Sequence, residues 1–181
     1  MNPLPSAVFL DRDGTIIKDV KYISRPEQVE LIDGVAEAIA RINAALVPVV
    51  VATNQSGIGR GYFTLADYES VKQRVEELLA ERGARIDATY HCPHRPEDRC
   101  RCRKPDTEMF EQAAADLGIE LGKALFIGDR WRDVEAALRF GAHGVLIPAE
   151  RTPPGEIEHA KIEARVADSL ATALDWYLCT N

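Results

Sequence analysis

The residues best suited to chemistry are acidic and follow short apolar runs. Asp11 and Asp13 come directly after the apolar run 7–10. An ionised carboxylate can attack phosphorus and form an acyl phosphate. A second carboxyl two residues later can protonate the leaving oxygen and then activate a water molecule. Gly14 permits the sharp turn that this arrangement needs, although an acidic surface turn would have the same local sequence.

A second acidic group follows another apolar run. Asp129 and Asp133 come after residues 124–127. Magnesium prefers oxygen ligands and substrate phosphates, and a cation between carboxylates offsets their repulsion and admits a phosphate dianion. The sequence therefore predicts a Mg²⁺ site. Asp133 also fits the first turn of a helix, where an acid favours the helix dipole.

Two further segments could hold a phosphoryl group. The stretch 53–59 offers hydroxyl, amide and backbone N–H groups after the apolar run 47–52. Arg103 and Lys104 offer cations that would neutralise charge on a transferring group. Each segment is weak evidence alone, because such residues also form ordinary turns and solvated surface.

Three cysteines and a histidine are clustered in the sequence. Cys92, His94, Cys100 and Cys102 form the Cys₃His set of a closed structural zinc site. The alternative is three free thiols beside a surface histidine, which is less favoured because exposed loops seldom carry clustered cysteines. His91 is adjacent and could replace His94. Four protein ligands leave no open position, so this zinc would be structural rather than catalytic.

Composition limits the classes of protein. The chain has 181 residues, of which 46% are hydrophobic and 28% charged, with a net charge of −7. This length suits a single domain, 1–181, and an acidic chain is a poor binder of nucleic acid. No segment approaches the roughly 18 apolar residues of a membrane span, and the first apolar run ends too soon for a signal peptide. We expect a cytoplasmic protein without nucleic-acid or membrane partners.

Short apolar runs alternate with helical periodicity, which is typical of a parallel sheet covered by helices on both faces. Thr64 is a plausible N-cap, and glycines 83 and 118 plausible helix ends. We expect strands at 7–10, 47–52, 88–91, 124–127 and 145–147. The expected helical faces are Val35, Ile39, Ile42 and Leu46; Tyr68, Val71, Val75, Leu78 and Leu79; Phe110, Ala113, Ala114 and Leu117; Val134, Ala137 and Leu138; and Leu170, Leu174, Trp176 and Tyr177.

Parallel sheets bind ligands beyond the carboxyl ends of their strands. The polar residues that follow the first, second and fourth expected strands should therefore converge at one edge. The segment 148–155 is rich in proline and is expected to be a loop.

The order of these motifs resembles the signature of the haloacid dehalogenase-like (HAD) superfamily across the whole chain: D-x-D-G-T, a strand ending in Thr, Lys-Pro, then G-D-x-x-x-D. The resemblance implies an α/β, Rossmann-like three-layer sandwich with a mainly parallel sheet. Asp13 favours a phosphatase or mutase, because the dehalogenases lack an acid there. The short spacings from Thr15 to Thr53 and from Thr53 to Lys104 leave little room for a separate cap domain.

The resemblance also implies residue roles. Asp11 would be the nucleophile and Asp13 the general acid and base, while Thr53 and Lys104 would bind the phosphoryl group. Magnesium would be held by Asp11, the main-chain carbonyl of Asp13, and Asp129, and the family pattern selects His94 for zinc. The residues implied to contact substrate are Asp19, Val20, Lys21, Tyr22, Thr53, Asn54, Gln55, Ser56, Arg103, Lys104 and Arg130.

Within the superfamily, the zinc loop is similar to that of the heptose-bisphosphate and histidinol-phosphate phosphatases. A bisphosphate needs cations away from the reaction centre, whereas an amine substrate needs acids. The basic residues near the motifs favour a doubly phosphorylated sugar. For such a substrate the resemblance implies removal of the 7-phosphate of D-glycero-D-manno-heptose 1,7-bisphosphate. These basic residues are Lys18, Lys21, Arg60, Arg95, Arg99, Arg101, Arg103, Lys104 and Arg130.

Other functions fit less well. Histidinol phosphate is the nearest alternative substrate. A polynucleotide 3′-phosphatase should carry a basic groove or stacking aromatics, and 7% aromatic residues with a net charge of −7 suggest neither. A phosphomutase needs a cap, and a non-enzymatic zinc module has no need of the acidic motifs. An open site on a small domain favours a monomer.

Overall fold

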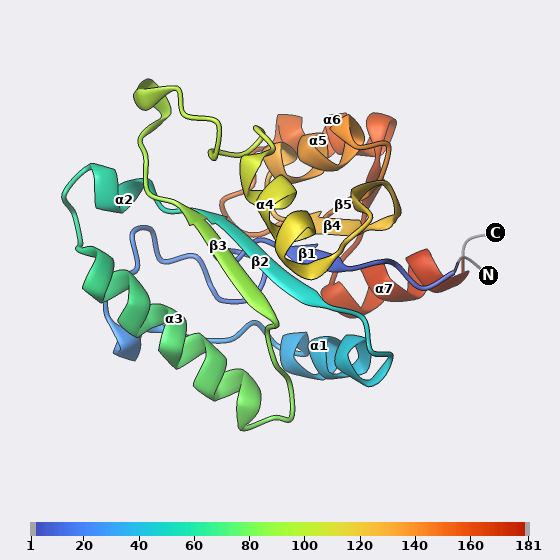
Figure 1. Ribbon diagram of the computed structural model, residues 1–181, viewed down its shortest axis with the longest axis horizontal. Helices are drawn as coiled ribbons and strands as arrows, with labels where there is room; N and C mark the ends of the chain where they lie inside the picture. The colour runs from blue at the N-terminus through green and yellow to red at the C-terminus, as the bar shows by residue number, and fades with distance from the viewer. Residues whose placement is uncertain (1–2, 180–181) are drawn as a thin grey trace.

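The centre of the protein is a sheet of parallel strands. The structure, a computed structural model, describes residues 3–179. Within them the strand order is β3-β2-β1-β4-β5-β6 (Figure 1). The Rossmann-like parallel sheet predicted from the sequence is confirmed. The strands are β1 (Val8–Leu10), β2 (Val49–Asn54), β3 (Ala88–Cys92), β4 (Leu125–Gly128), β5 (His143–Leu146) and β6 (Arg165–Val166).

Helices cover both faces of the sheet and make three layers (Figure 1). Side chains of α1, α3 and α7 share one core cluster with the sheet, and those of α4 and α5 share another. The α-helices are α1 (Val35–Ala44), α2 (Ser56–Gly59), α3 (Leu65–Ala80), α4 (Glu108–Leu117), α5 (Trp131–Arg139), α6 (Pro154–Glu163) and α7 (Leu170–Cys179). Short 3₁₀ turns lie at η1 (Pro26–Gln28), η2 (Pro96–Asp98) and η3 (Leu121–Lys123).

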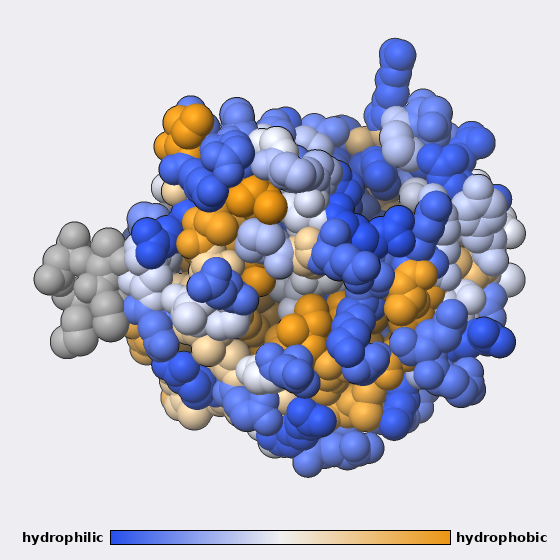
Figure 2. All heavy atoms as spheres, turned by 180° about the vertical axis from the view of Figure 1, so that it is seen from behind, coloured by the Kyte–Doolittle hydropathy of each residue, from blue (hydrophilic) through white to orange (hydrophobic). Residues whose placement is uncertain are grey.

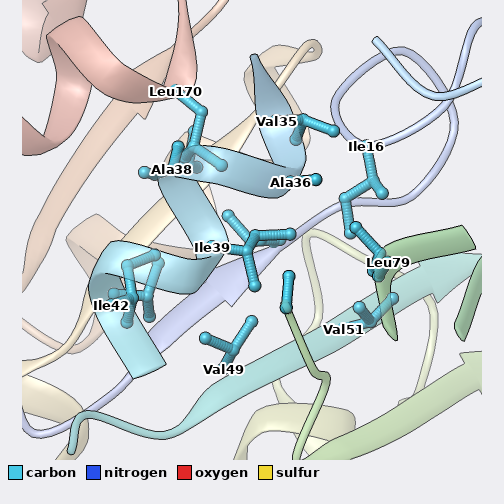
Figure 3. Close-up of a cluster of buried hydrophobic side chains, with 14 of the residues drawn as sticks. Ile16, Val35, Ala36, Ala38, Ile39, Ile42, Val49, Val51, Leu79 and Leu170 are labelled. Carbon is cyan, nitrogen blue, oxygen red and sulfur yellow. The ribbon is translucent and has the colours of Figure 1, made fainter. Parts of the chain in front are cut away.

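Side chains alternate between the two faces of the sheet along each strand, so the hydrophobic core has two parts, one on each face. In β1, Val8 and Leu10 belong to the cluster under α1, which Figure 3 shows around Ile39. Phe9 points to the opposite face, where its ring stacks on Phe126 at 4.8 Å between centroids. Because successive side chains of a strand point to opposite faces, this short apolar run fills both halves of the core and fixes the position of the residue that follows it.

The predicted capping signals are confirmed. The Thr64 hydroxyl accepts a hydrogen bond from the Asp67 N–H, and the Asp67 carboxylate accepts one from the Thr64 N–H at 2.7 Å. Gly118 follows α4 in the left-handed conformation, with φ of 69°. Strand β2 begins directly after Pro48, because a proline suits the start of a strand better than its centre.

Some predictions about elements were wrong. Leu46 does not extend the face of α1: the helix ends at Ala44, and Leu46 is 85% exposed with φ of 58°. Leu78 is only partly buried. The proline-rich segment is not wholly loop, because α6 begins at Pro154, and β6 follows it. Prolines near the first position suit a helix start, but the segment lacks apolar periodicity.

The described chain contains no separate cap domain. Residues 16–34 carry one short 3₁₀ turn and isolated bridges, and residues 93–107 carry another 3₁₀ turn. None of the helices between residues 3 and 179 is long and apolar enough to cross a membrane. From behind, the surface is mostly hydrophilic, with hydrophobic patches between polar side chains (Figure 2).

Candidate active site

The acidic motifs meet where the strand order reverses. Strands β1 and β4 are neighbours in the sheet, and Leu10 is in register with Ile127. Asp11 follows β1 directly and Asp129 follows β4 directly. Chain connections leave in opposite directions from two such strands, which opens a crevice at their carboxyl ends. The predicted convergence of polar residues at this edge is confirmed.

Three carboxylates lie together at this edge. Oxygens of Asp11, Asp129 and Asp133 lie within 4.8 Å of one another, and all three residues are buried. Burial, followed by the charges of Asp11 and Asp133, raises the pKa of Asp129 to about 8. Its Oδ1 is buried without a hydrogen-bond partner among the described residues. Such a group fits a divalent cation, which would supply the missing charge and ligand.

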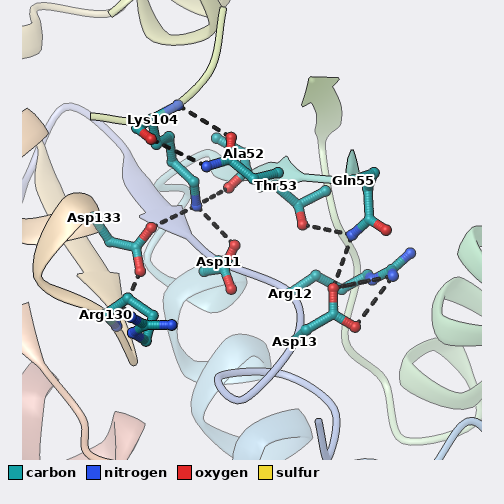
Figure 4. Close-up of polar contacts among 10 residues, drawn as sticks. Asp11, Arg12, Asp13, Ala52, Thr53, Gln55, Lys104, Arg130 and Asp133 are labelled. Atoms are coloured by element: carbon teal, nitrogen blue, oxygen red, sulfur yellow. Dashed lines mark hydrogen bonds and ion pairs between the residues drawn. The ribbon is translucent and has the colours of Figure 1, made fainter. Parts of the chain in front are cut away.

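Lys104 balances part of this negative charge (Figure 4). Its Nζ lies 2.7 Å from Asp11 Oδ1 and 2.6 Å from Asp133 Oδ1, and donates to the Ala52 carbonyl at 2.6 Å. The side chain is almost fully buried. Burial opposes its charge, but the two carboxylates outweigh burial and raise the pKa of Lys104. Lys104 is therefore a fixed cation beside Asp11, with Asp133 as its second anchor.

Asn54 holds Lys104 through the backbone. The Asn54 amide donates to the Lys104 carbonyl at 3.1 Å and accepts from the Lys104 N–H at 3.0 Å. Both hydrogen bonds cross from the end of β2 to the loop before α4. Asn54 was predicted to contact substrate; the structure gives it a positioning contact as well.

Asp13 lies across the edge from Lys104. Gln55 Nε2 donates to Asp13 Oδ2 at 2.8 Å and to the Thr53 hydroxyl at 2.8 Å (Figure 4). Arg12, almost fully buried, donates to both oxygens of Asp13 at 3.2 and 3.1 Å. The Arg12 guanidinium in turn lies over the ring of Tyr68, 5.4 Å from its centroid. These donors fix the second carboxyl of the D-x-D motif.

Glycine is required where the acidic turns touch. Gly14 has φ of 87°, and a Cβ there would lie 2.5 Å from Asp129 Oδ2. At Gly128 a Cβ would lie 2.2 Å from Asp133 Oδ2. The two strand ends can bring their carboxylates together only because neither glycine has a side chain.

The cysteine cluster is also assembled. Cys92, His94, Cys100 and Cys102 offer ligand atoms within 4.8 Å of one another. Cys100 Sγ lies 3.5 Å from the sulfurs of both Cys92 and Cys102, and His94 Nδ1 lies 3.2 Å from Cys102 Sγ. A tetrahedral zinc with thiolate bonds of about 2.3 Å spaces its sulfur ligands by about 3.7 Å, so the four side chains fit such an ion. His91 lies outside the group and packs on Tyr68, with ring centroids 4.3 Å apart.

The loop that carries Cys92, His94, Cys100 and Cys102, called the metal loop below, is hydrogen-bonded to the segment after β2. The Gln55 N–H donates to the Cys92 carbonyl at 2.7 Å, and the Gly59 N–H donates to the Pro93 carbonyl at 2.9 Å. Cys102 then precedes Lys104 by two residues. An ion at the cluster would therefore stabilise the backbone on both sides of the lysine that contacts Asp11.

A cavity of about 370 Å³ opens over the carboxyl edge. Of the residues predicted to contact substrate, Val20 is not among its lining residues and is 47% exposed. Lys104 is not a lining residue either, although its Nζ lies 2.7 Å from Asp11 Oδ1 and Asp11 lines the cavity. Lys18 pairs with Glu30 outside the cavity. The lining includes Asp11, Asp13, Asp19, Lys21, Tyr22, Thr53, Asn54, Gln55, Ser56, Arg60, Arg103, Asp129, Arg130, Arg132 and Arg151.

The arginines of the cavity differ in their partners. Arg130 is held by Glu156, with Nη2–Oε1 and Nε–Oε2 distances of 2.6 and 3.0 Å. Arg132 was not singled out from the sequence, although it shares the G-D-x-x-x-D motif with Arg130. Burial and then the charge of Arg132 lower the pKa of Arg103. The three other basic residues predicted to surround the motifs, Arg95, Arg99 and Arg101, do not line the cavity.

Comparisons with known proteins agree with this geometry. A HAD-hydrolase-like family model matches residues 101–173. A D-glycero-D-manno-heptose-1,7-bisphosphate 7-phosphatase from Thermosynechococcus vestitus is 38% identical, covering 97% of this chain and 96% of the relative. A D-glycero-beta-D-manno-heptose-1,7-bisphosphate 7-phosphatase from Pseudomonas aeruginosa is 43% identical over 78% of this chain and 80% of its own.

A solved structure is similar along nearly its whole length. The D,D-heptose 1,7-bisphosphate phosphatase from B. bronchiseptica, crystallised with magnesium and phosphate, superposes with a TM-score of 0.86 at 32% identity. The match covers 95% of this chain and 98% of that chain. Given this similarity and the acidic edge at the strand-order reversal, the chain belongs to the HAD-like hydrolase family and is a phosphatase.

Proposed function

We propose that this phosphatase removes the 7-phosphate of D-glycero-D-manno-heptose 1,7-bisphosphate through a phospho-aspartate on Asp11. The observation that carries the proposal is the position of Asp11, which lines the same cavity as Asp13 and Asp129 and has its Oδ1 2.7 Å from Lys104 Nζ. The choice of substrate is supported by the names of the similar phosphatases and by the basic residues that line the cavity.

The proposed first step uses the two carboxyls of the D-x-D motif. The ion pair to Lys104 occupies Oδ1 of Asp11, and Oδ2 takes no hydrogen bond from any residue within 3–179. This oxygen attacks phosphorus, and the bond from phosphorus to the sugar oxygen breaks. Asp13 gives its proton to that leaving oxygen. Thr53 and Lys104 offer the hydroxyl and the ammonium that stabilise charge on the phosphoryl oxygens.

The second step regenerates the enzyme. Asp13, now ionised, takes a proton from a water molecule whose oxygen attacks phosphorus. The acyl phosphate bond breaks, which releases inorganic phosphate and frees the Asp11 carboxylate. Gln55 and Arg12 hold Asp13 in place through both steps, since both donate to its carboxylate.

Two metal ions complete the proposal. Asp11, the main-chain carbonyl of Asp13, and Asp129 would hold Mg²⁺, with Asp133 engaged by Lys104. When bound, Mg²⁺ supplies positive charge that lets a phosphate dianion approach a carboxylate. Zn²⁺ at Cys92, His94, Cys100 and Cys102 would be structural, because four protein ligands leave no site for substrate.

Steady-state hydrolysis tests the substrate. In the presence of Mg²⁺, kcat/KM is measured for heptose 1,7-bisphosphate, histidinol phosphate and a 3′-phosphorylated oligonucleotide. We expect kcat/KM for the heptose to be higher by a factor of about 100 or more, which is roughly 2.7 kcal/mol of transition-state discrimination. A comparable preference for histidinol phosphate would contradict the substrate and leave the chemistry intact.

The nucleophile has its own test. Asp11→Asn should abolish hydrolysis of every substrate, whereas unchanged hydrolysis would exclude a phospho-aspartate on this residue. Wild-type enzyme quenched in acid during turnover should carry one phosphate on the peptide that contains Asp11.

We also propose that the chain acts as a one-domain monomer in the cytoplasm. The open edge needs no second copy to complete it. Light scattering during size-exclusion chromatography tests the monomer, and cell fractionation tests the compartment. A stable dimer would contradict the first proposal.

A further inference from the structure

The guanidinium that holds Asp13 is buried outside the lining of the reaction cavity. Arg12 is 3% exposed and is not among the residues that line the cavity, whereas Asp13 is. Asp13 is the one carboxylate within 4.0 Å of Arg12 in the described part of the chain, with Nη2 3.0 Å from Oδ2. The third nitrogen, Nη1, is buried with no hydrogen-bond partner among residues 3–179. Hydrogen bonds from Arg12 therefore leave one end of its guanidinium without an anchor.

The ring of Tyr68 supplies a second contact for this guanidinium. Tyr68 is the fourth residue of α3 and is 1% exposed. Arg12 Cζ lies 5.4 Å from the centroid of the ring. The attraction between a cation and an aromatic ring is stronger when both groups are removed from water, as they are here. Tyr68 therefore restrains the group that donates to both oxygens of Asp13.

The aromatic ring of Tyr68 makes this contact, and its hydroxyl does not contribute. The hydroxyl is buried without a hydrogen-bond partner within the described residues. Burial raises the pKa of Tyr68 well above its usual range, so the phenol is neutral and cannot pair with Arg12 as an anion. Because an unpaired buried hydroxyl only costs free energy, a phenylalanine ring would serve at this position equally well.

Tyr68 is itself fixed by two elements of the fold. The capping box of Thr64 and Asp67 begins α3, and the Tyr68 N–H donates to the Thr64 carbonyl at 3.1 Å. Its ring packs on His91 of β3, with centroids 4.3 Å apart. Burial lowers the pKa of His91, which favours a neutral imidazole near the charge of Arg12. The position of the Tyr68 ring is therefore set by α3 and β3 before any substrate binds.

We propose that Tyr68 is a positioning residue for proton transfer by Asp13, and that it acts through the guanidinium of Arg12. The inference rests on the proposed function, in which Asp13 protonates the leaving oxygen. A proton donor must lie within hydrogen-bond reach of that oxygen, and Arg12 holds both oxygens of Asp13. Tyr68 does not line the reaction cavity, so its effect on the reaction must pass through Arg12.

The leaving group distinguishes this role from a purely structural one. A sugar or phenol oxygen takes the proton of Asp13 as its bond to phosphorus breaks and departs as the neutral alcohol, while Asp13 becomes ionised. Nitrophenol is acidic enough to depart as the anion, so it needs no proton from Asp13. Both reactions produce the same phospho-aspartate, and kcat/KM reports only the steps up to the loss of the leaving group.

The test measures kcat/KM for p-nitrophenyl phosphate and phenyl phosphate, which differ mainly in the acidity of the leaving phenol. We expect Tyr68→Leu to lower kcat/KM for phenyl phosphate by about 10- to 100-fold, which is part of the full effect of a general acid. The fall for p-nitrophenyl phosphate should be about threefold or less, because its leaving group needs no proton. Tyr68→Phe keeps the ring and should behave as wild type for both substrates.

Two further variants separate positioning from stability. Tyr177→Leu removes another buried ring, which packs on His143 at the start of β5, and should leave the ratio of the two kcat/KM values unchanged. Arg12→Gln should shift the ratio in the same direction as Tyr68→Leu. Adding Tyr68→Leu to Arg12→Gln should change the ratio by about threefold or less, because two residues that act in series are not additive. Thermal melts check that all variants are folded.

Four results would overturn the inference. They are an unchanged ratio in Tyr68→Leu, an equal shift in Tyr177→Leu, a Tyr68→Phe variant that behaves like Tyr68→Leu, and effects of Arg12→Gln and Tyr68→Leu that multiply fully. Asp13→Asn tests the proposed function separately, since it should shift the ratio at least as far as Tyr68→Leu. An unchanged ratio in Asp13→Asn would reject Asp13 as the acid, whereas a shift there without one in Tyr68→Leu would reject only the role of Tyr68.

Discussion

Asn54 and Lys104 are joined by two hydrogen bonds in opposite directions, from the amide to the carbonyl at 3.1 Å and from the N–H to the amide oxygen at 3.0 Å. Asn43 makes the same pair of contacts with Arg85, at 3.2 and 2.8 Å, far from the cavity. The chain therefore contains its own control for the contribution of Asn54.

We expect Asn54→Ala to lower kcat by about 10- to 100-fold, because a displaced Lys104 no longer holds its place beside Asp11. Asn43→Ala should cost a similar amount of stability, about 1–3 kcal/mol, without a comparable loss of kcat. Steady-state kinetics and urea unfolding of both variants check this. Equal effects on kcat would show that Asn54 acts only through stability.

The second prediction concerns the lack of room for a side chain at Gly14. Gly14→Ala would place a methyl group 2.5 Å from Asp129 Oδ2 and so displace a predicted magnesium ligand. Gly83→Ala is the matched control, since Gly83 has a similar φ of 72° with nothing within 4 Å of its Cβ position. Both variants should lose about 1–2 kcal/mol from backbone strain. Only Gly14→Ala should need more Mg²⁺ for half-maximal activity; an equal Mg²⁺ requirement in both would count against Asp129 as a ligand.

The metal loop gives a third prediction. Cys100→Ser should lose tightly bound zinc and about 10- to 100-fold of kcat, because the loop no longer fixes Lys104. Arg101→Ser changes the neighbouring exposed residue and should retain both. Metal content by mass spectrometry and kcat are measured on the same samples. Full zinc occupancy in Cys100→Ser would mean that the ligand set is wrong.

Stability of the metal-free protein should depend on pH through Asp129. Its pKa is raised from 3.8 to about 8 by burial and by Asp11 and Asp133. The folded state therefore keeps a proton that the unfolded chain releases, so this stabilisation is complete below about pH 4 and is lost as pH rises toward 8. Mg²⁺ binds the ionised carboxylate, so its stabilising effect should grow over the same range.

Thermal melts with a chelator and with excess Mg²⁺, from about pH 5 to about pH 8, measure this linkage. Asp129→Asn serves as the control, because it cannot ionise at this position and should show a much smaller response to both pH and Mg²⁺. A Mg²⁺ effect that is independent of pH in the wild type would contradict the raised pKa of Asp129.

The sequence was informative where local rules decide the structure. The apolar runs predicted the strands from β1 to β5, and the D-x-D motif after β1 predicted where Asp11 would lie, because a parallel sheet brings its strand ends to one edge. Thr64 and Gly118 marked helix ends through capping chemistry that operates within a few residues. Leu46 failed as a core residue because spacing alone does not show where a helix ends.

Partners distant in the sequence could not be predicted. Arg130 was expected at the substrate, but its pairing with Glu156 depends on α6, a helix without the periodicity that reveals an amphipathic face. Arg132 was overlooked because a basic residue in a helix is usually solvated. Its unpaired Nε is visible only when the segments that line the cavity are assembled.

The ion pair between Arg130 and Glu156 shows that the reaction centre depends on residues beyond β5. Glu156 also accepts from the Trp131 N–H at 2.7 Å, and Thr152 donates to the Asp129 carbonyl at 2.7 Å. A chain shortened to end after β5 would keep all the residues assigned to the reacting phosphate. It would nevertheless leave the backbone around Asp129 without two of its side-chain anchors, so the chain beyond β5 helps to hold the reaction centre in place.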